Sequence, residues 1–437
     1  TPLPHQEYSL FHGRGNTAFN IGRFSEAEKD FFQAREVARK MGDQNKEAES
    51  LSMAAWTLAL GKKYEASVCI YREAIDFGKH IGNPVIEGRN LIGLGTITVA
   101  LGDVQGIRYV EEAVNIGKKI NSPLILTLAL SIRALQFPHC GIPDDEGLNY
   151  CKNIIPTLKA IQNARACVFV YLLLAYAQAC QGHYLPSIST FKEGIKLAEE
   201  TGEALNRAKI LNWLGWIYSD LGWISEAKKF NEQSYEATLK IGSGAEEAEA
   251  NAIVNLAENA VMERNYDQAQ KYLEDFLTQA ETDPGYLWGK VRWEVRLLCT
   301  LGEIYLHKNE ADEALNYAER AFNVAEKTLN KRGMIRANRL MGEIYLTRRE
   351  LSTAEEELKK ALSLAKDVGN PPHLWKTYFA LGHLKETQGL NQEANRHYKE
   401  ALNVTERLAW TLQDKKLRNI FLNSDHVTKI SDRLSRL

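Results

Sequence analysis

The sequence predicts an all-α protein, a right-handed α-solenoid of about ten antiparallel helix pairs with a C-terminal capping helix. The first observation is a repeat of about 40 residues, marked by a helix end followed by a polar or glycine turn. The second is the apolar spacing inside each repeat, which is helical and not alternating. The turn recurs at Met41-Gly42-Asp43, Ile81-Gly82-Asn83, Ile120-Asn121-Ser122, Ile161-Gln162-Asn163, Thr201-Gly202-Glu203, Ile241-Gly242-Ser243 and Val368-Gly369-Asn370.

Two further markers share this period. Glycine after a last helical turn fits a left-handed cap, which strains other residues. A second series of turns lies half a period out of phase, at Gly22, Gly61, Gly102, Gly182, Gly222 and Gly389. Small residues mark the second helix of each unit, at Ala27, Ser67, Ser187, Ala227, Ala269, Ala314, Ala354 and Ala394.

One unit in the middle of the chain illustrates the helical spacing. Leu211, Leu214, Gly215 and Tyr218 fall at i, i+3, i+4 and i+7 on one helix face. Ala227 lies on the facing side of the next helix. Because Gly215 and Ala227 are small, the two helix backbones can approach closely while larger neighbours fill the gaps.

These residues carry a family resemblance. Leu214-Gly215 with Tyr218, Gly222 and Ala227 resembles the tetratricopeptide repeat pattern W-x2-L-G-x2-Y followed by A-x3-F. Similar copies contain Leu94-Gly95, Leu301-Gly302, Met341-Gly342 and Leu381-Gly382, and Gly15 with Gly22 and Ala27 extends them to the start. The resemblance covers about residues 8 to 408 in ten units. Units near 40 residues, against the usual 34, look like those of the sensor arrays of MalT-like bacterial STAND ATPases, Pins/LGN adaptors and Rap-type regulators.

Two places depart from the pattern. The unit at about 122–162 lacks the Leu-Gly pair, has a longer turn at 137–143, and carries Pro156, which should kink or break its second helix. An insertion near 282–285 separates two later units. We expect bends there rather than domain boundaries. The domain prediction is therefore one array over 1–408 and a helical cap over 409–437 that covers the last repeat.

Charge and hydropathy exclude several classes. Lys and Arg number 54 against 56 Asp and Glu, a net charge of −2, so nothing draws the whole chain to nucleic acid or an anionic membrane. The longest apolar run, Ala166 to Ala177, is too short to span a bilayer. No signal peptide is visible, and the six cysteines form no CxxC pair, which predicts a cytoplasmic location. Because the first residue is Thr1, we expect a fragment of a longer protein.

Catalytic motifs are missing, which predicts a non-enzymatic protein with no cofactor and no bound metal. The sequence has no P-loop, Rossmann fingerprint, HExxH, GxSxG or kinase signature. His139, Cys140 and Cys151 come nearest to a metal cluster, but their spacing matches no closed zinc site. An enzyme or metal site in this irregular unit remains as the least favoured alternative.

The resemblance implies that the first helix of each pair lines a concave groove. Trp, Tyr and Arg are the residues that most often dominate binding surfaces. The groove would present Trp56, Tyr176, Asn212, Trp213, Trp216, Asn251, Asn255, Glu258, Arg296, Glu303, Arg336, Arg339, Glu343, Lys376 and His383. The alternative for any one aromatic residue is that it packs between neighbouring helices.

The functional prediction is a sensor array that binds a protein or peptide partner, as part of a multidomain bacterial signalling protein of the STAND kind. The alternative is a standalone scaffold of the Pins/LGN kind. A small-molecule effector and self-association stay open, whereas direct nucleic-acid binding and membrane binding are not expected.

Overall fold

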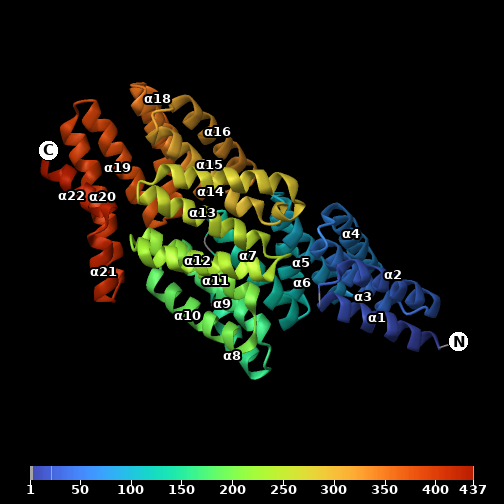
Figure 1. Ribbon diagram of the computed structural model, residues 1–437. Coiled ribbons are helices and arrows are strands. Elements are labelled where there is room, and N and C mark those ends of the chain that lie inside the picture. Colours follow the sequence, from blue (N-terminus) through green and yellow to red (C-terminus); the bar gives the residue numbers. More distant parts are fainter. Residues whose placement is uncertain (1–2, 21, 143, 437) are drawn as a thin grey trace. The chain divides into compact units, whose positions relative to one another are not determined.

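The ordered elements of the chain are helices (Figure 1). The computed structural model describes residues 3–20, 22–142 and 144–436. Across these ranges it has 22 α-helices, one short 3₁₀ helix and no strand. The helices are α1 (Pro4–Asn20), α2 (Phe24–Met41), α3 (Gln44–Leu60), α4 (Tyr64–His80), α5 (Pro84–Ala100), α6 (Gln105–Lys119), α7 (Pro123–His139), α8 (Asp145–Ala160), α9 (Ala164–Cys180), α10 (Tyr184–Thr201), α11 (Ala204–Asp220), α12 (Ile224–Ile241), α13 (Glu246–Met262), α14 (Tyr266–Thr282), η1 (Pro284–Leu287), α15 (Lys290–His307), α16 (Ala311–Lys327), α17 (Lys331–Thr347), α18 (Leu351–Val368), α19 (Pro371–Thr387), α20 (Asn391–Thr411), α21 (Lys415–Leu422) and α22 (Asp425–Arg436).

The predicted solenoid of ten helix pairs is confirmed, from α1–α2 to α19–α20. In nine of these pairs, all except α7 and α8, the two helices are shown to contact each other, as the green α11 and α12 do in Figure 1. The turns are left-handed, with φ of 70° at Gly42, 75° at Gly202 and 71° at Gly369. Where glycine is missing from the turn position, Lys62 and Asn121 adopt φ of 63° and 49°. The turn geometry is therefore kept even where it strains the residue.

Small residues allow the helices of a pair to pack closely. The predicted small positions of the second helices are completely buried, at Ala27, Ser67, Ser187, Ala227, Ala269, Ala314, Ala354 and Ala394. Two glycines of the first helices likewise leave no room for a larger side chain. A Cβ atom added at Gly342 would lie 2.6 Å from Cγ of Leu358, and one at Gly382 would lie 2.5 Å from Cε1 of Tyr398. Close packing at each crossing thus fixes how one helix lies on its partner.

The irregular unit differs from its prediction in two respects. The longer turn expected at 137–143 is shorter, because α7 continues to His139 and the turn starts at Cys140. Position 143 lies outside the described residues. The expected break at Pro156 is wrong, because α8 runs through it. Both Pro156 and Lys152, whose carbonyl loses its helical partner, lie on the exposed face, so water can satisfy that carbonyl.

The chain forms two compact units, residues 1–133 and 134–437. Their boundary falls inside α7, in the irregular unit, where the sequence had suggested a bend and no boundary. The predicted division at 408/409 concerns a different place and stays a prediction. The remaining sections describe the C-terminal unit, because it contains a cavity of about 1110 Å³.

The last two helices contact two different parts of the C-terminal unit. Ile430 of α22 packs with Trp375 and Ala401 of the last helix pair, the contact expected of a cap. Phe421 of α21 belongs to a second apolar cluster together with Tyr218 of α11. The sequence gave no sign of this second contact. The end of the chain therefore packs against helices about 200 positions earlier, in the same compact unit.

Unit five also contacts units nine and ten. The side-chain amide of Asn370 donates a hydrogen bond to the carbonyl of Cys180 at 2.9 Å. A Cβ atom added at Gly182 would lie 2.7 Å from Cδ of Pro371. These contacts and the α21–α11 packing together are called the closure contacts below. They join the two ends of the curved C-terminal unit, so its inner helices face a common interior.

No helix in the described ranges combines the length and the apolar character that crossing a lipid bilayer requires.

The close crossings make a prediction about two glycines of the N-terminal unit. In Gly95→Ala, the new Cβ would lie 2.7 Å from Cγ2 of Val110 and 2.8 Å from the carbonyl oxygen of Gly106. We expect a loss of about 1–3 kcal/mol in the free energy of unfolding, measured by urea denaturation followed by circular dichroism.

Gly13→Ala is the matched control, because nothing lies within 4 Å of its added Cβ. This change should raise the free energy of unfolding by up to about 1 kcal/mol through helix propensity alone. Equal effects of the two changes would mean that the crossing is not tightly packed.

Candidate functional site

The C-terminal unit encloses a cavity of about 1110 Å³. Its wall comes from α9, α11, α13, α15, α17 and α19, the first helices of units five to ten, and from α22. Twelve of the fifteen predicted groove residues line it: Tyr176, Trp213, Trp216, Asn251, Glu258, Arg296, Glu303, Arg336, Arg339, Glu343, Lys376 and His383. Most of the predicted groove positions in the C-terminal unit therefore line one cavity.

The other three predicted residues do not line this cavity. Asn212 and Asn255 are buried, each with 1% of its surface exposed. The Asn255 amide donates to the carbonyl of Asn212 and to Oδ1 of Asn231, both at 2.9 Å. These two asparagines therefore lie in the core and do not line this cavity, and the Asn255 side chain joins neighbouring helices there. Trp56 lies on α3 of the N-terminal unit.

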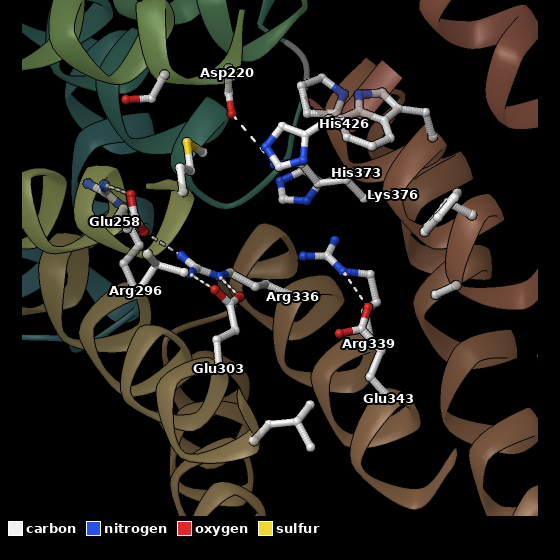
Figure 2. A pocket seen from close by; sticks show the side chains of 18 of the residues that line it. Asp220, Glu258, Arg296, Glu303, Arg336, Arg339, Glu343, His373, Lys376 and His426 are labelled. Carbon is white, nitrogen blue, oxygen red and sulfur yellow. Dashed lines mark hydrogen bonds and ion pairs between the residues drawn. The ribbon is translucent and has the colours of Figure 1, made fainter. Parts of the chain in front are cut away.

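A network of arginines and glutamates occupies one side of the cavity (Figure 2). Glu258 of α13 accepts from Arg296 of α15 and from Arg336 of α17, both at 2.5 Å. Arg336 also donates to both oxygens of Glu303 at 3.1 Å. Burial alone would raise the pKa of Glu258, but the two arginines outweigh it and lower this pKa to about 2. These charges compensate one another and tie three inner helices together.

On the opposite side of the cavity, the oppositely charged side chains lie farther apart. Arg339 of α17 lies 3.7 Å from Glu343, and Lys376 of α19 lies 3.8 Å from Asp220 of α11. Neither distance is a hydrogen bond. Nη1 of Arg339 is buried without a hydrogen-bond partner. Asp220 already accepts a hydrogen bond from the hydroxyl of Tyr184 at 3.2 Å.

Burial shifts the pKa values on this side toward the uncharged forms. The pKa of Glu343 is raised to about 7, because loss of water outweighs the attraction of Arg339. The pKa of Lys376 is lowered, mainly by burial and despite Asp220. Burial also lowers the pKa of His426 to about 3, with help from Lys376, so this imidazole is neutral.

Arg332 has no carboxylate within 4.0 Å in the part of the chain described. Its Nε donates to Nε2 of His373 at 3.4 Å, and its Nη1 donates to Sγ of Cys180 at 2.8 Å. The guanidinium carbon lies 5.1 Å from the ring centroid of Trp216, in cation–π range. Burial, followed by Arg332 and other nearby cations, holds the pKa of His373 well below its usual range, so it is neutral. The hydrogen-bond and cation–π partners of Arg332 are therefore all uncharged.

Aromatic rings form the part of the wall nearest α9 and α11. The ring of Trp213 lies 4.3 Å from that of Tyr176 and 6.1 Å from that of Phe191 between their centroids. Trp213 thus packs between helices, as the alternative prediction held, and still lines the cavity. Trp216 is half-buried and faces Arg332. The aromatic side of the predicted groove is present.

Cations outnumber acids on the wall. Among the described residues that line the cavity, nine are basic and five are acidic. The basic ones are Arg264, Arg292, Arg296, Arg332, Arg336, Arg339, Arg349, Lys376 and Lys429, and the acidic ones are Asp220, Glu258, Glu303, Glu343 and Asp425. Arg292 also has a carboxylate behind the wall, Glu247. The cavity interior is therefore positive, and the excess lies beside α17 and α19.

Arg332, His373, Asp220 and His426 were not predicted. Arg332 could have been found, because it lies one helical turn before Arg336 on the same face of α17. His373 stands in the same relation to Lys376 on α19. Asp220 and His426 meet these residues only through the closure contacts, for which no sequence signal exists.

The metal alternative in unit four finds no support among described side chains. Cys151 is buried in an apolar cluster, and burial raises the pKa of the Cys140 thiol to about 11. The side chain of His139 lies outside the described residues. In the described ranges, no three His, Cys, Asp or Glu side chains come together as a metal site would need.

An array of successive antiparallel helix pairs defines a helical repeat protein. Family models of the tetratricopeptide repeat match residues 208–240, 293–367 and 333–407. The chain therefore carries tetratricopeptide repeats, as its sequence pattern predicted.

One solved structure shows a similar fold. A Rap protein complexed with competence and sporulation factor superposes with a TM-score of 0.51 at 12% identity, covering 80% of this chain and 99% of that chain. The APC/C hetero-tetramer Cut9-Hcn1 gives 0.36 at 14% identity, covering 98% and 96%. None of the curated proteins matches the chain.

Glu258 makes a prediction about acid stability. At pH 7, Glu258→Gln should cost about 3 kcal/mol of unfolding free energy, because Arg296 and Arg336 lose their shared carboxylate. The native pKa lies below the ordinary value of 4.5, so this stabilisation is present above 4.5 and is lost as pH falls toward 2. Urea titrations of both proteins at a series of pH values should show the difference shrink in acid.

For Glu343 we expect the opposite pH dependence of stability. Its native pKa of about 7 lies above the ordinary 4.5, so its contribution is complete below 4.5 and is lost as pH rises through 7. The groups facing it are Arg339, Arg336, Glu303 and Lys376. Relative to Glu343→Gln, the wild type should lose stability between about pH 5 and pH 8. A difference that does not change with pH would show that Glu343 titrates normally.

Proposed function

We propose that the C-terminal unit is a non-catalytic receptor that holds a peptide, or a ligand of similar size, in its interior. The observation that carries the proposal is the cavity of about 1110 Å³ lined by the inner helices of six successive repeats. Ligand pockets usually measure about 300–1,000 Å³, so this one has room for several residues of an extended chain.

The character of the wall supports the same proposal. Trp213 and Trp216 offer large apolar rings, and Arg296 and Arg336 are fixed in place by carboxylates. Aromatic and arginine side chains dominate binding energies because they combine contact area with rigid, directional donors. A prearranged wall also reduces the entropy lost on binding. The Rap protein of similar fold was solved with a bound factor, which is a precedent for an occupied array.

We further propose that this receptor is the sensor part of a larger cytoplasmic signalling protein of the STAND kind. The support is the unit length of about 40 residues and the absence of disulfides among the six cysteines of the whole chain, five of which are buried. The sequence of the full parent gene tests this part. An NTPase domain next to the array would agree with it, whereas a gene that encodes only the repeats would favour a standalone scaffold.

A peptide-library selection on the purified chain tests the receptor proposal. For the selected peptides, we expect Trp216→Ala to weaken binding by about 10-fold or more, because this ring lines the cavity. The matched control is Trp410→Ala, because Trp410 is 77% exposed and does not line the cavity. Calorimetric titration of both variants gives the affinities.

A photoreactive version of a selected peptide locates the binding site on the wild-type chain. This second measurement does not depend on whether Trp216→Ala folds. Crosslinks to the wild-type chain should map to α13, α15, α17 and α19. Crosslinks confined to the outer helices α12, α14, α16 and α18 would overturn the proposal, as would equal binding by the two tryptophan variants.

A further inference from the structure

Three cations on one side of the cavity lack a full counter-charge. Arg332 has only neutral partners, Arg339 has a buried Nη1 without an acceptor, and Lys376 is 3.8 Å from its nearest carboxylate. In Figure 2, Arg339, Lys376 and His373 lie to one side of Arg336, and Glu303 and Glu258 lie to its other side. A hydrogen-bonded network satisfies one side, whereas the other side has unused donors.

The three side chains face a shared space. Arg332 and Arg339 are seven residues apart on α17, two helical turns, so they project from one face. Arg332 donates to His373 at 3.4 Å, and Lys376 lies one turn after His373 on α19. All three cations act on the charge of His373. The three cations therefore lie near the junction of α17 and α19 and line the same cavity.

Such a group of like charges is costly without an anion. A buried charge needs hydrogen bonds or an opposite charge, and an unmatched donor loses its hydration without return. The two nearest carboxylates do not fill this need. Asp220 accepts from Tyr184 with Oδ2, and its Oδ1 lies 3.8 Å from Lys376, beyond hydrogen-bond distance. Glu343 likewise lies beyond hydrogen-bond distance from Arg339. One oxyanion with several lone pairs would satisfy the donors that remain.

We propose that Arg332, Arg339 and Lys376 form a binding site for a single anionic group of the ligand, a carboxylate or a phosphate. The inference rests on the proposed receptor function and adds the chemistry of its ligand. The ring of Trp216 beneath Arg332 fixes the guanidinium and offers an apolar surface beside the anion. An anionic group attached to an aromatic or aliphatic part fits this arrangement.

Two small probes test the site in the full chain. N-acetyl-phenylalanine and its amide differ only in the carboxylate, and inorganic phosphate at constant ionic strength tests the bare anion. We expect calorimetry to show the carboxylate probe binding at least about tenfold more tightly than the amide. Phosphate should raise the melting temperature more than chloride does. The stronger effect of the two identifies carboxylate or phosphate as the preferred group.

Arg332→Gln/Arg339→Gln removes two charges and keeps hydrogen-bonding side chains. This variant should lose the response to both anions, while its unliganded form is at least as stable as the wild type because repulsion is relieved. Arg407→Gln, an exposed change on α20, is the control and should respond as the wild type does.

Either of two results with the small probes would overturn the anion site. One is a wild type that responds to neither anion, and the other is a double variant that keeps the wild-type response. If selected peptides bind the cavity but their amidated, uncharged forms bind equally well, the receptor proposal survives and the anion site alone fails. A double variant that is much less stable without ligand would show that the arginines serve the fold.

Discussion

The packing of α21 and α22 against α11 is the interaction on which the site depends. Phe421 of α21 and Val427 of α22 belong to one apolar cluster with Tyr218 of α11, which brings the end of the chain against the inner helices. These inner helices line the cavity, and the charges on its wall lose part of their hydration. The shifted pKa values of Glu258, Glu343 and His426 all follow from that loss and from the partner each group has found.

The two sides of the cavity differ in how far their charges are compensated. Glu258 serves two arginines, so its side is rigid and nearly neutral. Arg332 and Arg339 have no such acid at hydrogen-bond distance. A ligand would therefore meet a fixed aromatic and polar wall on one side and uncompensated positive charge on the other. Shape and charge would then orient it in a single direction.

The fold could be predicted from the sequence almost completely, because its markers are local. A turn at Gly42 or a small residue at Ala227 acts on its own helix pair, and the period reveals every copy. The site could be predicted in part. Inner positions such as Arg336 and Lys376 followed from helix position, but Asn255 at an equivalent place points into the core. Helix position alone does not separate these cases, because small rotations of a helix decide which side a residue faces.

The contacts between segments far apart in the sequence could not be predicted. Asn370 bonds to the backbone of Cys180 across 190 positions, and no periodic pattern encodes that pairing. Solenoids usually gain or lose repeats easily, because each repeat touches only its neighbours. Here the number of repeats between unit five and the last helices is fixed by geometry. Inserting or deleting one unit would carry Asn370 past Cys180 and reopen the interior, so we expect the repeat count of this region to be as constrained as the residues of the cavity.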